Sequence, residues 1–206
     1  TGECRGSIVS LFANTTYDVQ LTMSDPDGAV TSSDVQVTTW SESFPIGQTI
    51  YIDDRSTTLV ADQSGTSNAY TLYTPAPGQS GTISINNLYP HGIEVTGNYI
   101  VIRGFTITGP QTHGIFLGNV HDVVIEENEI ANWGTWSPPP DDEFGERNNS
   151  AVYSESGLLE RVTIQRNEFH HPRTDSNSWV EPRSCQPPIC DNPNHPHGPT
   201  GVFFKN

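Results

Sequence analysis

The chain has 206 residues, of which 33% are hydrophobic, and its 18 glycines and 16 prolines suit short strands joined by turns rather than long helices. Its 24 acidic residues against nine basic ones give a formal net charge of −15, which argues against nucleic acid or an anionic membrane surface as a partner, because either needs a basic face. No apolar run approaches the length that spans a membrane.

Residues 1–40 are predicted to supply the C-terminal strands of a β-sandwich. Apolar and polar residues alternate in 7–11, 17–23 and 34–39, as in half-buried strands, and the turn-forming sequence SDPDGAV precedes the last of these. The stretch LFANTTYDVQL, in which a leucine precedes a tyrosine by six residues, resembles the corner of fibronectin type III domains. That resemblance implies a bond from the hydroxyl of Tyr17 to the chain upstream.

Residues 41–90 are predicted to form a linker, followed by the N-terminal capping and first coils of a second domain. The linker begins around WSESFPIG, and short strand candidates separated by turns follow it at 49–53, 58–62, 70–75 and 81–87.

Residues 91–206 are periodic. HGIEV at 91 recurs as HGIFL at 113, a spacing of 22, and SAVYS at 150 and TGVFF at 200 fit the same slot. A second phrase recurs as IVIRGFTI (100–107), VVIEENEI (123–130) and VTIQRNEF (162–169). A unit of 22–23 residues with two or three short strands is the length of one coil of a right-handed parallel β-helix. The predicted fold class is therefore all-β, a right-handed parallel β-helix preceded by the last strands of a β-sandwich.

Stacked coils align equivalent side chains inside the solenoid. Three apolar ladders are predicted: Ile93, Ile115, Val152 and Val202; Ile102, Ile125 and Ile164; and Ile107, Ile130 and Phe169. Asn128 and Asn167 fall in register at a turn, where stacked amides can bond one another and satisfy the turn backbone. Leucine-rich repeats have a similar period, but their leucine and asparagine spacing is absent.

Two insertions interrupt the repeat. The last two copies of the second phrase lie 39 residues apart, 16 more than one coil of 23, and the excess falls in 131–149. A longer excursion occupies 170–199. Both leave after the same strand and return before the same strand, so we expect them to emerge on one side of the solenoid, where repeat proteins commonly place function.

The insertions hold the candidate site residues. Flat indole rings stack on apolar faces of sugars, while polar groups bind hydroxyl and acid groups, so the pattern predicts carbohydrate binding. The substrate-binding candidates are Trp133, Trp136, Trp179, His170 and His171, and the catalytic candidates are Arg173, Arg183, Glu181, Asp175 and Lys205. The alternative is that the tryptophans pack the long loops onto the solenoid.

Metal binding has one candidate. Asp141, Asp142 and Glu143 form an acidic cluster that could bind Ca²⁺, which takes six to eight oxygen ligands. The alternative is a solvated surface run. The pair His170 and His171 lacks the helical ligand spacing of many zinc sites.

The cysteines and the glycosylation sequons indicate in which cellular compartment the protein is found. Cys185 and Cys190 enclose QPPI, and a disulfide between them would favour an oxidising compartment, whereas two free thiols are the alternative. Sequons at Asn14 and Asn148 are consistent with export and glycosylation. These features predict an extracellular or cell-surface protein.

The periodic region resembles the secreted pectate-lyase-like superfamily, which includes polysaccharide lyases, glycoside hydrolases and epimerases. The resemblance spans residues 41–206 and implies the fold. Lyases of this fold use a Lys or Arg base, often with calcium, and hydrolases use paired carboxylates, but no diagnostic catalytic motif is matched here.

Two functions from different classes are predicted. The first is an extracellular polysaccharide-active enzyme, lyase or hydrolase, or a sugar-binding module with its cleft between the insertions. The second is a structural or adhesive surface protein whose solenoid is a rod. Because the sandwich lacks its opposing sheet and the last coil has no following rung, further segments of the same protein or other chains are expected to cover both ends.

Overall fold

The computed structural model describes residues 7–24, 26–28, 30–134, 149–173 and 200–204, and all the regular structure in these ranges is β-strand. The chain divides into two compact units, Thr1–Phe44 and Pro45–Asn206. The boundary falls within the segment predicted to be a linker.

The described strands of the first unit form one antiparallel hairpin, β1 (Thr16–Ser24) with β2 (Val30–Thr38). The tyrosine-corner bond is confirmed, because the hydroxyl of Tyr17 accepts a hydrogen bond from the backbone N–H of Phe12 at 2.8 Å. The strand predicted at 7–11 is wrong. Ser10 has φ = 63°, a left-handed conformation that breaks an extended run. An opposing sheet does not occur among the described residues of this unit.

The hairpin has one apolar and one polar face, since side chains alternate along each strand. The polar face carries cross-strand hydrogen bonds from Gln20 to Asp34 at 3.1 Å and from Gln36 to Asp18 at 2.9 Å. The apolar face carries Tyr17, Val19, Leu21 and Met23 of β1 with Val35 and Val37 of β2. These side chains are exposed or half-buried, and Met23 is 70% exposed.

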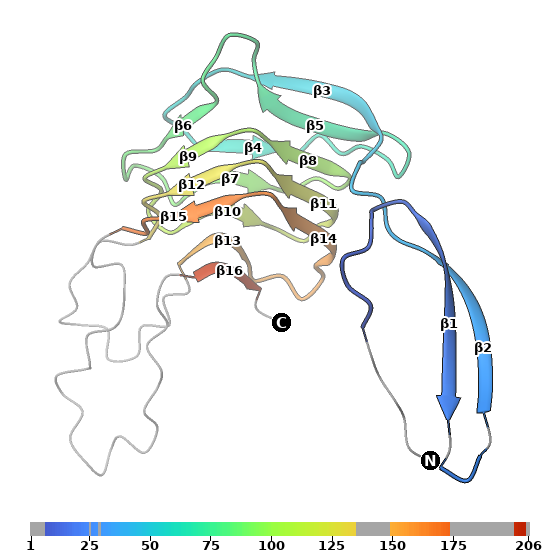
Figure 1. Cartoon of the computed structure of the whole chain (residues 1–206). Helices are drawn as coiled ribbons and strands as arrows, with labels where there is room; N and C mark the ends of the chain where they lie inside the picture. Colours follow the sequence, from blue (N-terminus) through green and yellow to red (C-terminus); the bar gives the residue numbers. More distant parts are fainter. Residues whose placement is uncertain (1–6, 25, 29, 135–148, 174–199, 205–206) are drawn as a thin grey trace, which may run out of the picture. The chain divides into compact units, whose positions relative to one another are not determined.

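The described strands of the second unit form a parallel β-helix of three sheets (Figure 1). Sheet I contains β3 (Ile46–Ile52), β5 (Tyr70–Pro75), β8 (Ile100–Arg103), β11 (His121–Glu126) and β14 (Glu160–Gln165). Sheet II contains β6 (Thr82–Ser84), β9 (Thr106–Thr108), β12 (Glu129–Ala131) and β15 (Glu168–His170). Sheet III contains β4 (Leu59–Ala61), β7 (His91–Val95), β10 (His113–Leu117), β13 (Ser150–Ser154) and β16 (Thr200–Phe204).

Each turn of the solenoid visits sheets I, II and III in that order, and sheets I and III have five strands each. In the first turn, an isolated bridge between Arg55 and Ile83 takes the place of a strand in sheet II. Residues 45–90 therefore supply coils that pair directly with the repeats that follow them, through β5 with β8 and β4 with β7.

The three predicted ladders are confirmed by the strand register. Ile93, Ile115, Val152 and Val202 pair in sheet III, Ile102, Ile125 and Ile164 in sheet I, and Ile107, Ile130 and Phe169 in sheet II. The ladders also extend back into earlier coils, to Leu59, Tyr73 and Ile83. The central members are fully buried, so these columns are the hydrophobic core.

Turns recur at fixed points of each coil. Residues with left-handed backbone stand in three columns with the spacings of the sequence repeat, 23 and then 39: Gly81, Gly104, Glu127 and Arg166; Asn86, Gly109, Asn132 and His171; and Tyr99, Asp122 and Arg161. Left-handed φ is costly for residues other than glycine, asparagine and aspartate. The geometry of the coil is therefore kept even where the side chain does not favour it.

The repeated HGI phrase has a steric reason. A Cβ atom on Gly92 would clash with Cγ2 of Ile107, and one on Gly114 would clash with Cγ2 of Ile130. Both glycines are the second residues of sheet III strands, β7 and β10, and there the backbone lies too close to a core isoleucine of sheet II to carry a side chain.

The predicted asparagine pair is confirmed. The side-chain amide of Asn128 donates to Oδ1 of Asn167 at 3.0 Å and to the carbonyl of Ile102 at 3.0 Å, while its own Oδ1 accepts from the backbone N–H of Phe105 at 3.0 Å. Asn167 donates in turn to the carbonyl of Ile125 at 2.8 Å. The two amides thus satisfy the turn backbone of three consecutive coils.

Candidate functional site

Both insertions begin at the same end of sheet II. Ala131 and His170, the last residues of β12 and β15, are paired neighbours. The pairing continues outward, because the N–H of Asn132 donates to the carbonyl of His171 at 2.8 Å and the N–H of Arg173 donates to that of Trp133 at 2.9 Å. The insertions also return side by side, into β13 and β16. The described ends of the two insertions therefore lie beside each other in neighbouring coils, as the chain order predicted.

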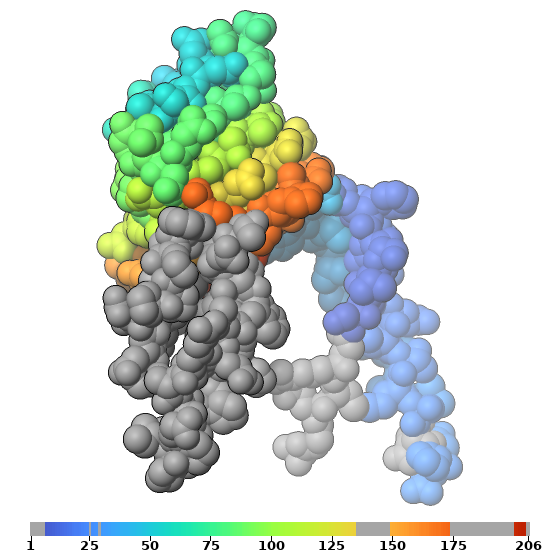
Figure 2. Space-filling model, turned by 90° about the vertical axis from the view of Figure 1, so that its left-hand side faces the viewer, coloured from blue at the N-terminus to red at the C-terminus, as the bar shows by residue number. Residues whose placement is uncertain are grey.

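The outer face of sheet II is polar. Successive coils follow one another on the side of the solenoid that Figure 2 turns toward the viewer, where the colour runs from green through yellow to orange. Since Ile83, Ile107, Ile130 and Phe169 point into the core, their neighbours on either side point outward. One outward row contains Thr82, Thr106, Glu129 and Glu168, and the other contains Ser84, Thr108, Ala131 and His170. Hydroxyl, carboxylate and imidazole groups therefore follow one another from coil to coil toward the start of the insertions.

A carboxylate and two imidazoles meet at this end of sheet II. Nε2 of His170 lies 3.0 Å from Oε1 of Glu129, and its Nδ1 lies 2.6 Å from Nδ1 of His171. Glu168 is farther away, at 4.0 Å from Nε2 of His170. Thr106 donates a long hydrogen bond of 3.5 Å to the other oxygen of Glu129. We refer to Glu129, Glu168, His170 and His171 as the corner cluster.

Sequence reasoning identified the two histidines of the corner cluster but missed the two glutamates. The signal was present in the repeated phrase, because Glu129 and Glu168 stand at the same position in VVIEENEI and VTIQRNEF. That position precedes the inward residue of sheet II, so its side chain must point outward.

Trp133 and Arg173 stabilise the stems of the insertions. Trp133 is 3% exposed and packs in the hydrophobic core, which favours the packing role that the sequence also allowed over stacking on a sugar. Nη2 of Arg173 donates to the carbonyls of Gly109 at 3.2 Å and Pro110 at 3.4 Å, in the turn after β9. Both side chains thus fix the described ends of the insertions to the solenoid, Trp133 through the core and Arg173 through the turn after β9.

The other candidates are placed as follows. Asn14 is exposed, and its backbone N–H donates to the carbonyl of Trp40 at 2.9 Å. The remaining predicted site residues lie outside the described residues: Trp136, Asp141, Asp142, Glu143, Asn148, Asp175, Trp179, Glu181, Arg183, Cys185, Cys190 and Lys205. Within the described part of the chain, no group of three or more His, Cys, Asp or Glu side chains could hold a metal ion.

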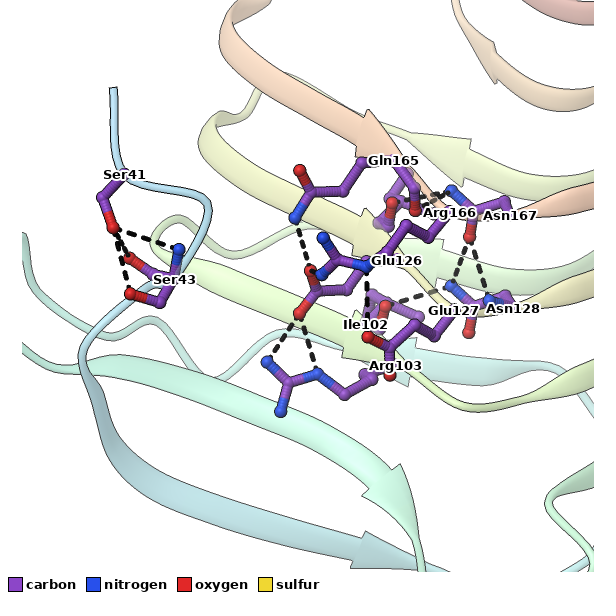
Figure 3. Close-up of polar contacts among 11 residues, drawn as sticks. Ser41, Ser43, Ile102, Arg103, Glu126, Glu127, Asn128, Gln165, Arg166 and Asn167 are labelled. Carbon is purple, nitrogen blue, oxygen red and sulfur yellow. Dashed lines mark hydrogen bonds and ion pairs between the residues drawn. The ribbon is translucent and has the colours of Figure 1, made fainter. Parts of the chain in front are cut away.

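A second polar cluster lies on the outer face of sheet I (Figure 3). The Glu126 side chain is 1% exposed and accepts from Nε and Nη2 of Arg103, at 2.8 and 2.5 Å. Its other oxygen accepts from Gln165 and from Arg166, each at 2.6 Å. The donors come from the coils on either side, so this carboxylate links three consecutive coils.

Aromatic rings stack along sheet III. The His113 and Tyr153 rings are parallel within 1°, with centroids 3.9 Å apart, and Phe203 continues the stack at 5.7 Å from Tyr153. Nδ1 of His113 accepts from the N–H of Ser150 at 3.2 Å. Burial lowers the pKa of His113 to about 3 and that of His91 to about 4. Because the ring faces contact one another, they are not available to stack on a sugar, and the column stabilises the solenoid.

Comparison with known proteins supports the fold and leaves the activity open. Residues 91–184 match the family model of the right-handed beta helix region. No curated protein and no solved structure matches the chain. In the part of the chain that the structure describes, no helix is long and apolar enough to cross a membrane. Residues 91–184 are thus similar to right-handed β-helix proteins, in agreement with the coils seen here.

Proposed function

We propose that this chain is an extracellular carbohydrate-binding or carbohydrate-active β-helix protein, and that an extended polysaccharide lies along the outer face of sheet II. The corner cluster is the observation that carries the proposal. It places carboxylates and imidazoles at the point where both insertions begin, on a face whose outward rows are polar over successive coils. Such groups bind sugar hydroxyls through several hydrogen bonds at once.

The pair of glutamates favours hydrolase-like over lyase-like chemistry at this corner, if the protein is an enzyme. Glu129 and Glu168 are direct neighbours in adjacent coils, and glycoside hydrolases use two carboxyl groups flanking the scissile bond. Among the catalytic candidates of the basic type that a lyase needs, Arg173 is the one that lies in the described residues, and it is bonded to backbone carbonyls instead. Ca²⁺ binding by Asp141, Asp142 and Glu143, which lie outside the described residues, remains a prediction and would accompany lyase-like chemistry.

Binding to a panel of intact polysaccharides tests this function. In affinity electrophoresis, a polysaccharide in the gel slows a protein that binds it. We expect Glu129→Gln and Glu168→Gln to be slowed less than the wild type by the same polysaccharide. Glu94→Gln is the matched control, because Glu94 lies in β7 of sheet III, away from the corner cluster. Reducing-sugar release and the absorbance of unsaturated products then separate hydrolysis, elimination and binding alone. Absence of binding across the panel, or equal loss in all three variants, would contradict the proposal.

A structural or adhesive protein is the second candidate, and the hairpin favours it. The apolar face of β1 and β2 is exposed, with Met23 70% exposed, and an apolar sheet face of this kind typically packs against another sheet. Self-association that depends on Met23 and Leu21, without retention of any polysaccharide, would support this candidate over the first.

A further inference from the structure

The corner cluster contains a hydrogen-bond chain whose order fixes where its protons lie. We infer that Glu129, His170 and His171 form a proton relay whose accepting end is Nε2 of His171, and that it takes the proton of a water molecule or a saccharide hydroxyl held at this corner. Glu129 and His170 are positioning residues in this relay. The inference deepens the proposed function, on which its choice of substrate rests.

The direction of the relay follows from the carboxylate. An ionised carboxylate can only accept, so the 3.0 Å contact with Glu129 requires the proton of neutral His170 on Nε2. Nδ1 of His170 then carries a lone pair, and the 2.6 Å contact requires His171 to donate from its own Nδ1. Nε2 of His171 is left as a lone pair that can accept a proton.

Proton uptake is balanced along the chain. The oxygen–hydrogen bond of the donor breaks, its electron pair stays on oxygen, and the proton bonds to Nε2 of His171. The Nδ1 proton of His171 can then cross the 2.6 Å contact to Nδ1 of His170. The positive charge thereby comes to lie beside the Glu129 carboxylate, where Coulomb attraction is greatest.

The backbone holds His171 in an uncommon conformation. Its φ is 48°, in a column where the other coils have Asn86, Gly109 and Asn132. Its carbonyl accepts from Asn132 at 2.8 Å, and its ring meets that of His170 edge-on, at 86° with centroids 4.9 Å apart. No described residue bonds Nε2 of His171, which leaves this atom to face a ligand.

Ring-nitrogen NMR of the full chain, selectively ¹⁵N-labelled at histidine, tests the relay directly. In the neutral form of the wild type we expect His170 as the Nε2–H tautomer and His171 as the Nδ1–H tautomer, which free imidazole side chains disfavour. Glu129→Leu and His170→Phe should both return His171 to the Nε2–H form. Glu168→Gln should leave both tautomers unchanged, since Glu168 lies 4.0 Å from His170.

The relay would be overturned if wild-type His171 carries its proton on Nε2. It would also be overturned if the tautomer of His171 is unchanged in both Glu129→Leu and His170→Phe. If a variant fails to fold, as judged by circular dichroism, the wild-type tautomers decide the question alone. The spectra need no sugar. Correct tautomers without polysaccharide binding would therefore refute the proposed function and keep the relay, whereas binding with the opposite tautomer would do the reverse.

Discussion

At the scale of single residues, stability rests on side chains that fill one position in a stack. Ile125 has a paired neighbour above and below it in sheet I, Ile102 and Ile164, and is fully buried. Asn128 plays the same part among the polar groups, because its amide bonds to the coils on both sides. Removal of the Ile125 or Asn128 side chain therefore removes contacts in three consecutive coils.

Ile125→Ala should lower the free energy of unfolding by about 2–5 kcal/mol, because it removes buried methyl groups and leaves a cavity between coils. Urea denaturation followed by circular dichroism measures the loss. Leu158→Ala is the control: Leu158 is 68% exposed, so its change should stay within about 0.5 kcal/mol. Equal effects of the two substitutions would argue against the buried ladder.

The stacked histidines should make the solenoid sensitive to acid. The folded-state pKa values of His91 and His113, about 4 and about 3, lie below the ordinary value of 6.5, so the unfolded chain binds protons more readily. Their contribution to stability is complete above about pH 6.5 and is lost as the pH falls toward those folded-state values.

Urea midpoints measured between pH 7 and pH 4 check this dependence. His113→Phe keeps an aromatic ring in the stack but has no proton to gain, so its midpoint should fall less steeply over that range. The substitution also removes the acceptor for Ser150, and a lower midpoint at pH 7 is expected. A slope identical to that of the wild type would show that His113 does not titrate as described.

At the scale of elements, neighbouring strands are tied by side chains on their outer faces as well as by the core. Glu126 ends β11 and contacts Arg103 at the end of β8 and Gln165 at the end of β14. The Glu126 carboxylate is almost fully buried, and the guanidinium groups of Arg103 and Arg166 balance its charge. These contacts hold the turns between sheets I and II in register across three coils.

Glu126→Gln should reduce the free energy of unfolding by about 1–3 kcal/mol, because the charge-assisted hydrogen bonds from Arg103 and Arg166 to the carboxylate are lost. The loss is smaller than for a fully buried ion pair, since both arginines reach solvent. Glu127→Gln, at the adjacent residue, is the control. Glu127 is 51% exposed and contacts Arg166 at 3.2 Å, so its substitution should change stability by about 0.5 kcal/mol or less. A larger effect at Glu127 than at Glu126 would contradict this assignment.

At the scale of the whole molecule, the chain with its two compact units carries a formal net charge of −15. An acidic surface repels nucleic acids and other polyanions. A neutral polysaccharide, or an acidic one accompanied by cations, is therefore the polymer that we expect the outer face of sheet II to bind.

Cys185 and Cys190, which lie outside the described residues, should be joined by a disulfide if the protein is extracellular. Alkylation without prior reduction, followed by peptide mass spectrometry, should find neither thiol labelled. Cys4 serves as an internal reference for a cysteine with no predicted partner. Labelling of both Cys185 and Cys190 in freshly isolated protein would refute the disulfide and weaken the extracellular assignment.

The sequence alone determined the coil length, the three ladders and the asparagine pair. Those features depend on local rules, the alternation of side chains along a strand and the return of the same phrase after 23 residues. Chain order likewise required both insertions to leave from the same edge. The alternating pattern at 7–11 predicted a strand that does not form, because the left-handed backbone of Ser10 interrupts the extended conformation.

Only the tertiary structure decided which side chains meet across coils. The contact of Glu129 with His170, the donors around Glu126 and the stack of His113 on Tyr153 all join residues that lie 23 to 41 positions apart. Register places such residues in neighbouring rows, but rotamers, ring orientation and the closeness of adjacent turns determine whether they bond. Trp133 shows the same limit. The sequence allowed either stacking on a sugar or packing onto the solenoid, and only the tertiary structure shows that this side chain is buried in the core.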